Sequence, residues 1–121
     1  RSLARFYSAL APAASDESPR LLSDGALREA TKLVTDAEDR VLGVPARKSM
    51  GYVLGGPNVA SGQRITSFGH GGIGGCMGFG DPEHRFAYAL TKNRLTVAAP
   101  EDNLSFAVAR EVREALGIPE V

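Results

Sequence analysis

Several features that mark specialised protein classes are missing from this chain. It has no tryptophan and one cysteine, Cys76, in 121 residues, so an internal disulfide is excluded and a disulfide scaffold with it. No run approaches the roughly 20 apolar residues that a membrane-spanning helix needs. The amino end also lacks the basic, apolar and small-residue order of a signal peptide. We therefore expect no membrane association, and the single thiol fits a reducing compartment such as the cytoplasm.

The chain also lacks an excess of charge of either sign. Fourteen Lys and Arg residues balance fourteen Asp and Glu residues, so no net field attracts a polyanion, and we expect no nucleic-acid partner. Hydrophobic residues make up 43% and charged residues 23%, as in ordinary folded domains. Together with the length, this composition predicts one folded unit spanning residues 1–121.

The spacing of apolar residues predicts three helices. One occupies residues 3–10 and ends before Pro12, and residues 12–20 are expected to form a surface loop. A second starts at Ser23 as its cap, continues to Val34 and ends before the charged residues 36–40. The closing helix is expected over about residues 101–116.

Glycine is abundant where the helical spacing is absent. In residues 41–64, which are rich in Gly and Pro, we expect one strand at Tyr52–Leu54. Residues 69–80 hold seven of the fourteen glycines, interleaved with apolar residues, and Asp81-Pro82 then predicts a hairpin turn before a strand at Phe86–Leu90. Antiparallel strands with helices at both ends define an α+β fold.

Individual side chains in this pattern have predicted environments. Cys76 is expected to pack as a small hydrophobic group, and His84 to lie in solvent in the Asp81-Pro82 turn. Aromatic residues at helix or strand spacing are core candidates: Phe6, Tyr7, Phe86, Tyr88 and Phe106.

Two kinds of cofactor site are disfavoured by their context. Residues 69–74 match the dinucleotide pattern G-x-G-x-x-G, but more glycines follow instead of a helix, and the acidic residue expected about 20 positions later is absent. His70, Cys76 and His84 do not have the spacing of a zinc site. We therefore predict no cofactor and no metal.

A complete serine-hydrolase site is also absent from these residues. No Ser-x-x-Lys, Gly-x-Ser-x-Gly or Tyr-x-Asn sequence occurs, and none of the nine serines has Lys three residues later. The nearest imitation, Ser61-Gly62-Gln63-Arg64, places a permanently protonated Arg where a proton acceptor is needed. The isolated chain is predicted to be inactive as a serine hydrolase.

The block Phe68–Gly78 and the strand that follows the Asp81-Pro82 turn nevertheless carry a family resemblance. With Leu3–Tyr7, Leu21-Leu22-Ser23 and the closing helix, they resemble the carboxyl-terminal part of the serine β-lactamase-related family. That family includes class C β-lactamases, family VIII carboxylesterases and D-aminopeptidase-like enzymes. The resemblance implies a β-lactamase/transpeptidase-like fold, also that of penicillin-binding proteins, with this chain as its carboxyl-terminal segment.

The resemblance also implies roles for four residues. His70-Gly71-Gly72 looks like the family's third motif, with His70 in the place of its Lys. The backbone N–H of Ile73 would then complete an oxyanion hole, and Gly71 and Gly72 would let the substrate lie against the strand. Because imidazole is largely neutral at pH 7, unlike Lys, hydrolysis of an acyl ester or amide is favoured over recognition of a β-lactam carboxylate.

The resemblance places the nucleophile in an amino-terminal segment missing from this chain, which would be its partner in the active site. Two other interpretations remain open at this point. The chain could be a non-catalytic interaction module that forms homo-oligomers through exposed sheet edges, or a degenerate family member without chemistry.

Overall fold

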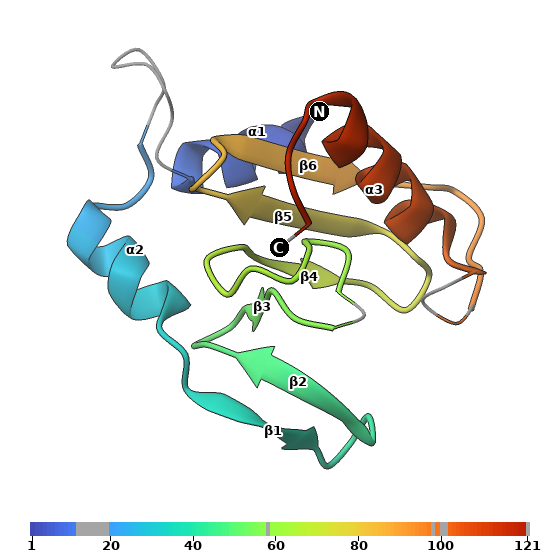
Figure 1. Ribbon diagram of the computed structural model, residues 1–121, viewed down its shortest axis with the longest axis horizontal. Coiled ribbons are helices and arrows are strands. Elements are labelled where there is room, and N and C mark those ends of the chain that lie inside the picture. The colour runs from blue at the N-terminus through green and yellow to red at the C-terminus, as the bar shows by residue number, and fades with distance from the viewer. Residues whose placement is uncertain (12–19, 58, 98, 100–101, 121) are drawn as a thin grey trace.

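One antiparallel sheet with helices on both faces organises the chain (Figure 1). The computed structural model describes residues 1–11, 20–57, 59–97, 99 and 102–120. The helices are α1 (Ser2–Leu10), α2 (Asp24–Thr31) and α3 (Leu104–Ala115). The strands are β1 (Thr35–Asp39), β2 (Val44–Lys48), β3 (Val53–Leu54), β4 (Phe68–Gly71), β5 (Met77–Asp81) and β6 (Phe86–Leu90). They pair in chain order, and the expected α+β class with an antiparallel sheet is confirmed.

Two hydrophobic clusters hold α1 and α3 against opposite faces of the sheet. On the α1 face, Tyr7 and Leu10 pack with Leu54 and Phe68. On the α3 face, a second cluster comprises Met77, Phe79, Tyr88 and Ala109. The alternation of side chains along β5 explains the division, because Met77 and Phe79 point to one face while Gly78 and Gly80 leave room on the other. Figure 1 shows α3 in front of β5 and β6, with α1 behind them.

A buried ion pair joins α3 to the sheet beneath it. Arg113 is 4% exposed, and its Nη1 lies 3.2 Å from Oδ2 of Asp81, which is fully buried at the end of β5. The Nη2 atom of Arg113 donates to the carbonyl of Ser61, and the guanidinium carbon lies 5.3 Å from the ring centroid of Phe79. One side chain therefore connects α3, β5 and the β3–β4 connection.

The helix predictions are confirmed where their ends have side-chain caps. The Ser23 hydroxyl accepts a hydrogen bond from the Ala26 N–H at 3.2 Å, as expected for an N-cap. At the start of α3, Asn103 accepts from the Ser105 N–H at 3.0 Å, so this helix begins slightly later than its apolar spacing suggests. The loop predicted for residues 12–20 lies almost wholly outside the described residues.

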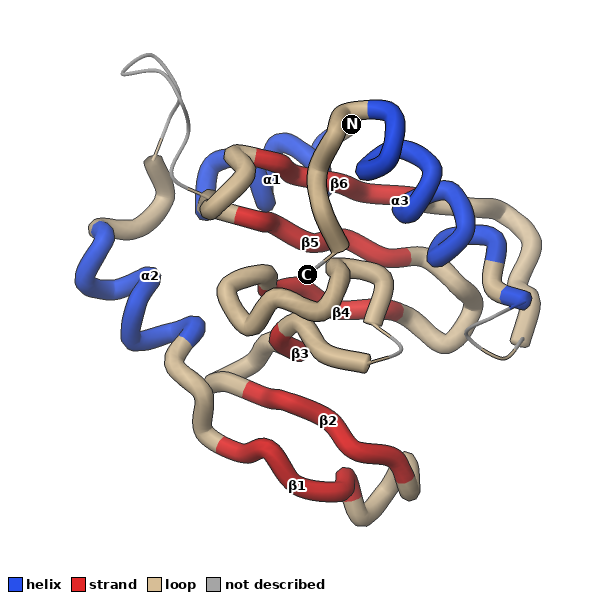
Figure 2. Tube along the Cα trace, viewed as in Figure 1, coloured by secondary structure: helices blue, strands red, loops and turns tan. Residues whose placement is uncertain are grey.

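The region around β1 and β2 differs from the prediction (Figure 2). α2 ends at Thr31 rather than continuing to Val34, and residues 35–39 form β1 instead of a charged end to the helix. Residues 41–64 contain two strands, β2 and β3, not one. β1 pairs with β2 along its whole length, so its strand structure comes from backbone hydrogen bonds with β2. Because its side chains are mostly charged and exposed, the sequence of β1 has no apolar alternation that would predict a strand.

Two side-chain predictions are also wrong. His84 is half-buried rather than solvated, because its Nδ1 lies 3.1 Å from Asp81 Oδ2. Phe6 is 44% exposed and contacts the edge of Tyr7 instead of entering the core. Tyr7 and Tyr88 are buried as expected, and Phe86 and Phe106 are half-buried against the α3 cluster.

The Arg113–Asp81 pair generates a prediction for stability. Replacing Arg113 with Met leaves the Asp81 carboxylate buried without its guanidinium, which should lower the free energy of unfolding by about 3–5 kcal/mol. Urea unfolding measures the change. The matched control is Arg20→Met, which removes the exposed Arg20–Asp24 pair and should have little effect. Equal stability of both variants would contradict a linking role for Arg113.

Candidate functional site

The candidate site lies at the end of β4 and in the turn that leads to β5. His70 and Gly71 are the last two residues of β4, and Gly72 and Ile73 follow directly. All four residues are exposed, with Ile73 at 82%. The four predicted residues, which are consecutive in the sequence, are therefore all accessible at the end of β4, beyond its pairing with β3. This β4–β5 turn lies beside the segment that connects β6 to α3 (Figure 1).

The His70 ring has a hydrogen-bond partner in the backbone of the next residue. Its Nδ1 lies 2.7 Å from the carbonyl oxygen of Gly71. A carbonyl can only accept, so Nδ1 carries the hydrogen and donates it. In the neutral ring, Nε2 then keeps its lone pair and is a hydrogen-bond acceptor. The neutral form of this ring therefore presents its acceptor atom, Nε2, away from the Gly71 carbonyl.

Backbone hydrogen bonds shape the turn and leave one donor unused. The Gly72 N–H donates to the Cys76 carbonyl at 2.7 Å, and the Gly75 N–H donates to the Gly72 carbonyl at 2.8 Å. Among the described residues, nothing accepts from the N–H of Ile73, which lies between these two bonds. A Cβ at Gly71 would meet no atom within 4 Å, so the strand edge next to this donor is open.

Close packing by α1 supports this edge from behind. His70 pairs with Gly78 of β5, and a Cβ at Gly78 would lie 2.5 Å from Cε2 of Tyr7. Only glycine lets the Tyr7 ring rest on the strand there. Burial raises the pKa of Tyr7, as does the neighbouring Tyr52, whereas a hydrogen bond with the His70 backbone acts in the opposite direction. Sequence spacing identified Tyr7 as a core residue but gave no signal of its position beneath His70.

Two further contacts anchor the turn to neighbouring segments. The Lys92 N–H lies 3.4 Å from the sulfur of Cys76, a half-buried residue, and this contact joins the turn to the segment that follows β6. The Ser105 hydroxyl donates to the Gly75 carbonyl and ties the turn to the start of α3. These partners are distant in the sequence, and no local motif could have identified them.

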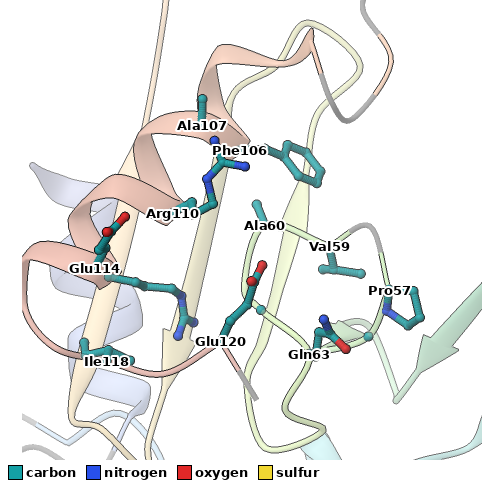
Figure 3. Close-up of a pocket in the computed structure, with 13 residues that line it drawn as sticks. Pro57, Val59, Ala60, Gln63, Phe106, Ala107, Arg110, Glu114, Ile118 and Glu120 are labelled. Carbon is teal, nitrogen blue, oxygen red and sulfur yellow. The ribbon is translucent and has the colours of Figure 1, made fainter.

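A groove in the described part of the chain lies away from these four residues. A groove of about 580 Å³ runs between α3 and the β3–β4 connection, with Phe106, Arg110, Gln63 and Glu120 on its walls (Figure 3). Neither His70 nor Ile73 lines it. Across the described parts of the chain, no group of three or more His, Cys, Asp or Glu side chains could hold a metal ion. Within those same parts, no helix is long and apolar enough to cross a membrane.

The antiparallel sheet with its flanking helices defines a class of protein: the β-lactamase/transpeptidase-like fold. The Caulobacter crescentus structure of a novel penicillin-binding protein homologue is similar with a TM-score of 0.78 and 26% identity, over 92% of this chain and 30% of that chain. EstA from Arthrobacter nitroguajacolicus Rue61a has a TM-score of 0.81 over 95% of this chain and 31% of its own, with 22% identity, and so supports the fold alone.

The chain belongs to the Beta-lactamase family, whose model matches residues 1–112. It is 36% identical over 99 residues to the esterase/beta-lactamase LipL of Mycobacterium tuberculosis, covering 78% of this chain and 21% of that protein. A family VIII carboxylesterase structure matches with a TM-score of 0.76 and 27% identity, over 93% of this chain and 31% of its own. The family resemblance inferred from the sequence is confirmed, and the chain spans about a third or less of these relatives.

Proposed function

We propose that this chain is the carboxyl-terminal segment of a serine hydrolase that cleaves carboxylic esters or amides. In this proposal, residues 1–121 supply the strand that flanks the substrate, and a Ser-x-x-Lys nucleophile lies elsewhere in the complete polypeptide. The observation that carries it is the Ile73 N–H, an exposed backbone donor without an acceptor in the described chain, beside the open edge at Gly71. The names of LipL and of the carboxylesterase support ester chemistry.

The proposed chemistry follows from where charge develops. The serine hydroxyl gives its proton to a base in the complete polypeptide and its oxygen attacks the acyl carbon. The carbonyl π electrons move to the carbonyl oxygen, and a tetrahedral oxyanion forms. The Ile73 N–H donates to that oxyanion, and a fixed donor of this kind stabilises the transition state without reorganisation. Collapse of the intermediate expels the alcohol or amine, which takes up a proton, and water then releases the acid from the acyl-enzyme.

His70 has a different task in this proposal. Its Nε2, left as an acceptor by the Nδ1–H bond to Gly71, can accept a hydrogen bond from a hydroxyl or water next to the scissile group. An acceptor does not attract a carboxylate, so this arrangement favours neutral esters and amides over the carboxylate of a β-lactam.

The sheet offers a place for the rest of such a polypeptide. β6 (Phe86–Leu90) is an edge strand without charged residues, whereas the opposite edge, β1, carries Asp36, Glu38 and Asp39. Charges on an edge strand oppose pairing, and their absence on β6 permits it. We propose that a strand from the missing segment pairs there, in preference to the homo-oligomer or interaction module considered above.

Covalent labelling tests the proposal. The complete protein, incubated with a fluorophosphonate probe, should be labelled on a serine followed three residues later by Lys, outside residues 1–121. Peptide mapping locates the label, and residues 1–121 expressed alone should stay unlabelled. Labelling of any of the nine serines in this chain would contradict the division of the site. A complete protein that neither labels nor cleaves an activated ester would support the degenerate interpretation instead.

The oxyanion role of Ile73 depends on its backbone. Ile73→Pro removes the N–H and should lower kcat for p-nitrophenyl acetate in the complete protein by about 10²- to 10³-fold. Ile73→Ala keeps the N–H and should change kcat for this short ester little. Steady-state kinetics and melting curves of both variants check the result. Similar small losses in both would contradict the assignment.

His70 and His84 form a matched pair for the acceptor role. His70→Ala should lower kcat/KM for an activated ester and leave the melting temperature unchanged, because the ring is exposed. His84→Ala should lower the melting temperature and leave kcat/KM unchanged, because it removes a partner of the buried Asp81 carboxylate. An unchanged rate for His70→Ala in a folded protein would remove His70 from the site.

A further inference from the structure

The end of β4 that carries the candidate site has a strand partner on one side only. β3 pairs with β4 at Phe68 and Gly69 and does not reach His70, whereas β5 pairs with β4 from Phe68 through Gly71. A segment with fewer backbone partners opens more easily than one paired on both sides. The backbone at His70 and Gly71 therefore depends on support from the face of the sheet to keep a fixed position.

The face that supplies this support is the one covered by α1. Phe68 and His70 are two residues apart on β4, so their side chains leave the strand on the same face. Phe68 is fully buried in the cluster on the α1 face, and its ring centroid lies 6.2 Å from that of Tyr7. His70 thus lies on the same face, at the exposed end of the strand.

Tyr7 fills the space opposite His70 on this face. Gly78 is the cross-strand partner of His70, and the side chains of such partners normally lie side by side. Gly78 has no side chain, and the Tyr7 ring takes its place: a Cβ there would lie 2.5 Å from Cε2 of Tyr7 and 2.9 Å from Cγ of Leu3. The Tyr7 ring is therefore the neighbour of His70 across the strand pair.

The phenol oxygen of Tyr7 makes a second contact with the same strand end. Burial and the nearby Tyr52 raise the pKa of Tyr7, and a hydrogen bond with the His70 backbone lowers it. That hydrogen bond places the phenol oxygen at the backbone of His70. Tyr7 is only 5% exposed, so residues of this chain surround almost the whole side chain. Its ring thus contacts β5 and its oxygen contacts β4, both at the His70–Gly78 pair.

We infer that Tyr7 is a positioning residue, which fixes the backbone of His70 and thereby the Gly71–Ile73 segment that follows it. The inference rests on the proposed function and deepens it, because Tyr7 acts through the backbone of His70 rather than by contact with the substrate. A backbone donor stabilises an oxyanion without reorganisation only when it is held in place before the reaction. A displacement of about 1 Å can cost about 10²-fold in rate.

Removing the phenol oxygen tests this role in the complete protein. Tyr7→Phe keeps the ring on Gly78 and should lower kcat for p-nitrophenyl acetate by about three- to tenfold, the effect of one lost hydrogen bond. KM should stay unchanged, because the oxyanion forms only in the transition state. The matched control is Tyr52→Phe, which removes the neighbouring phenol oxygen on the same face of the sheet and should leave both constants unchanged.

A double-mutant cycle separates positioning from a general loss of stability. Tyr7→Phe should have little further effect on kcat in the Ile73→Pro background, which already lacks the donor that Tyr7 positions. Hydrogen–deuterium exchange gives a readout that does not need activity. Peptides covering residues 69–73 should exchange faster in Tyr7→Phe than in the wild type, and at the wild-type rate in Tyr52→Phe. Melting curves accompany each variant.

The outcomes separate the positioning role from the proposed function. An unchanged kcat or unchanged exchange in Tyr7→Phe, with ester hydrolysis intact, would overturn the positioning role and leave the hydrolase proposal standing. Equal losses of kcat in the wild-type and Ile73→Pro backgrounds would do the same, because they would show that Tyr7 acts independently of the Ile73 N–H. A complete protein that hydrolyses no ester would overturn the proposed function, and the positioning role with it.

Discussion

The buried guanidinium of Arg113 joins the parts of this structure that are far apart in the chain. It pairs with Asp81 at the end of β5, donates to Ser61 in the β3–β4 connection and lies against Phe79. A charge at this depth is tolerated only when partners surround it, so the pair requires α3, β5 and the connection to be in place at once. The α3 cluster of Met77, Phe79, Tyr88 and Ala109 forms around it.

On the other face of the sheet, the packing of α1 is limited by steric contact rather than by charge. Tyr7 can rest on β5 only because position 78 is glycine, and Gly78 is the strand partner of His70. α1 thereby supports the strand end that carries the candidate site, while the bonds of Gly72 and Gly75 shape the turn that exposes the Ile73 N–H. The glycine density that resembled a nucleotide motif thus serves close packing and a sharp turn. It also allows Leu95 to pack on the turn at Gly74.

The helices, the hairpin at Asp81-Pro82 and the family could be inferred from local patterns. The Ser23 cap and the apolar spacing of α3 are patterns within a few residues. The His70-Gly71-Gly72 block resembles the family motif by its own sequence alone. The misassigned elements depended on distant partners. The sequence of β1 predicted a charged helix end because its strand structure depends on pairing with β2. His84 was predicted to be solvated because its partner, Asp81, is buried only when Arg113 packs against it.

The sequence by itself therefore determined the secondary structure with strong periodicity and the family, and it predicted the four residues of the candidate site. These signals come from interactions between residues a few positions apart, which the order of residues shows directly. Only the tertiary structure decided the unused N–H of Ile73, the position of Tyr7 beneath the strand and the packing of Leu95 on the turn. Each of these depends on atoms brought together by the packing of separate segments, and such contacts leave no trace in the local order of residues.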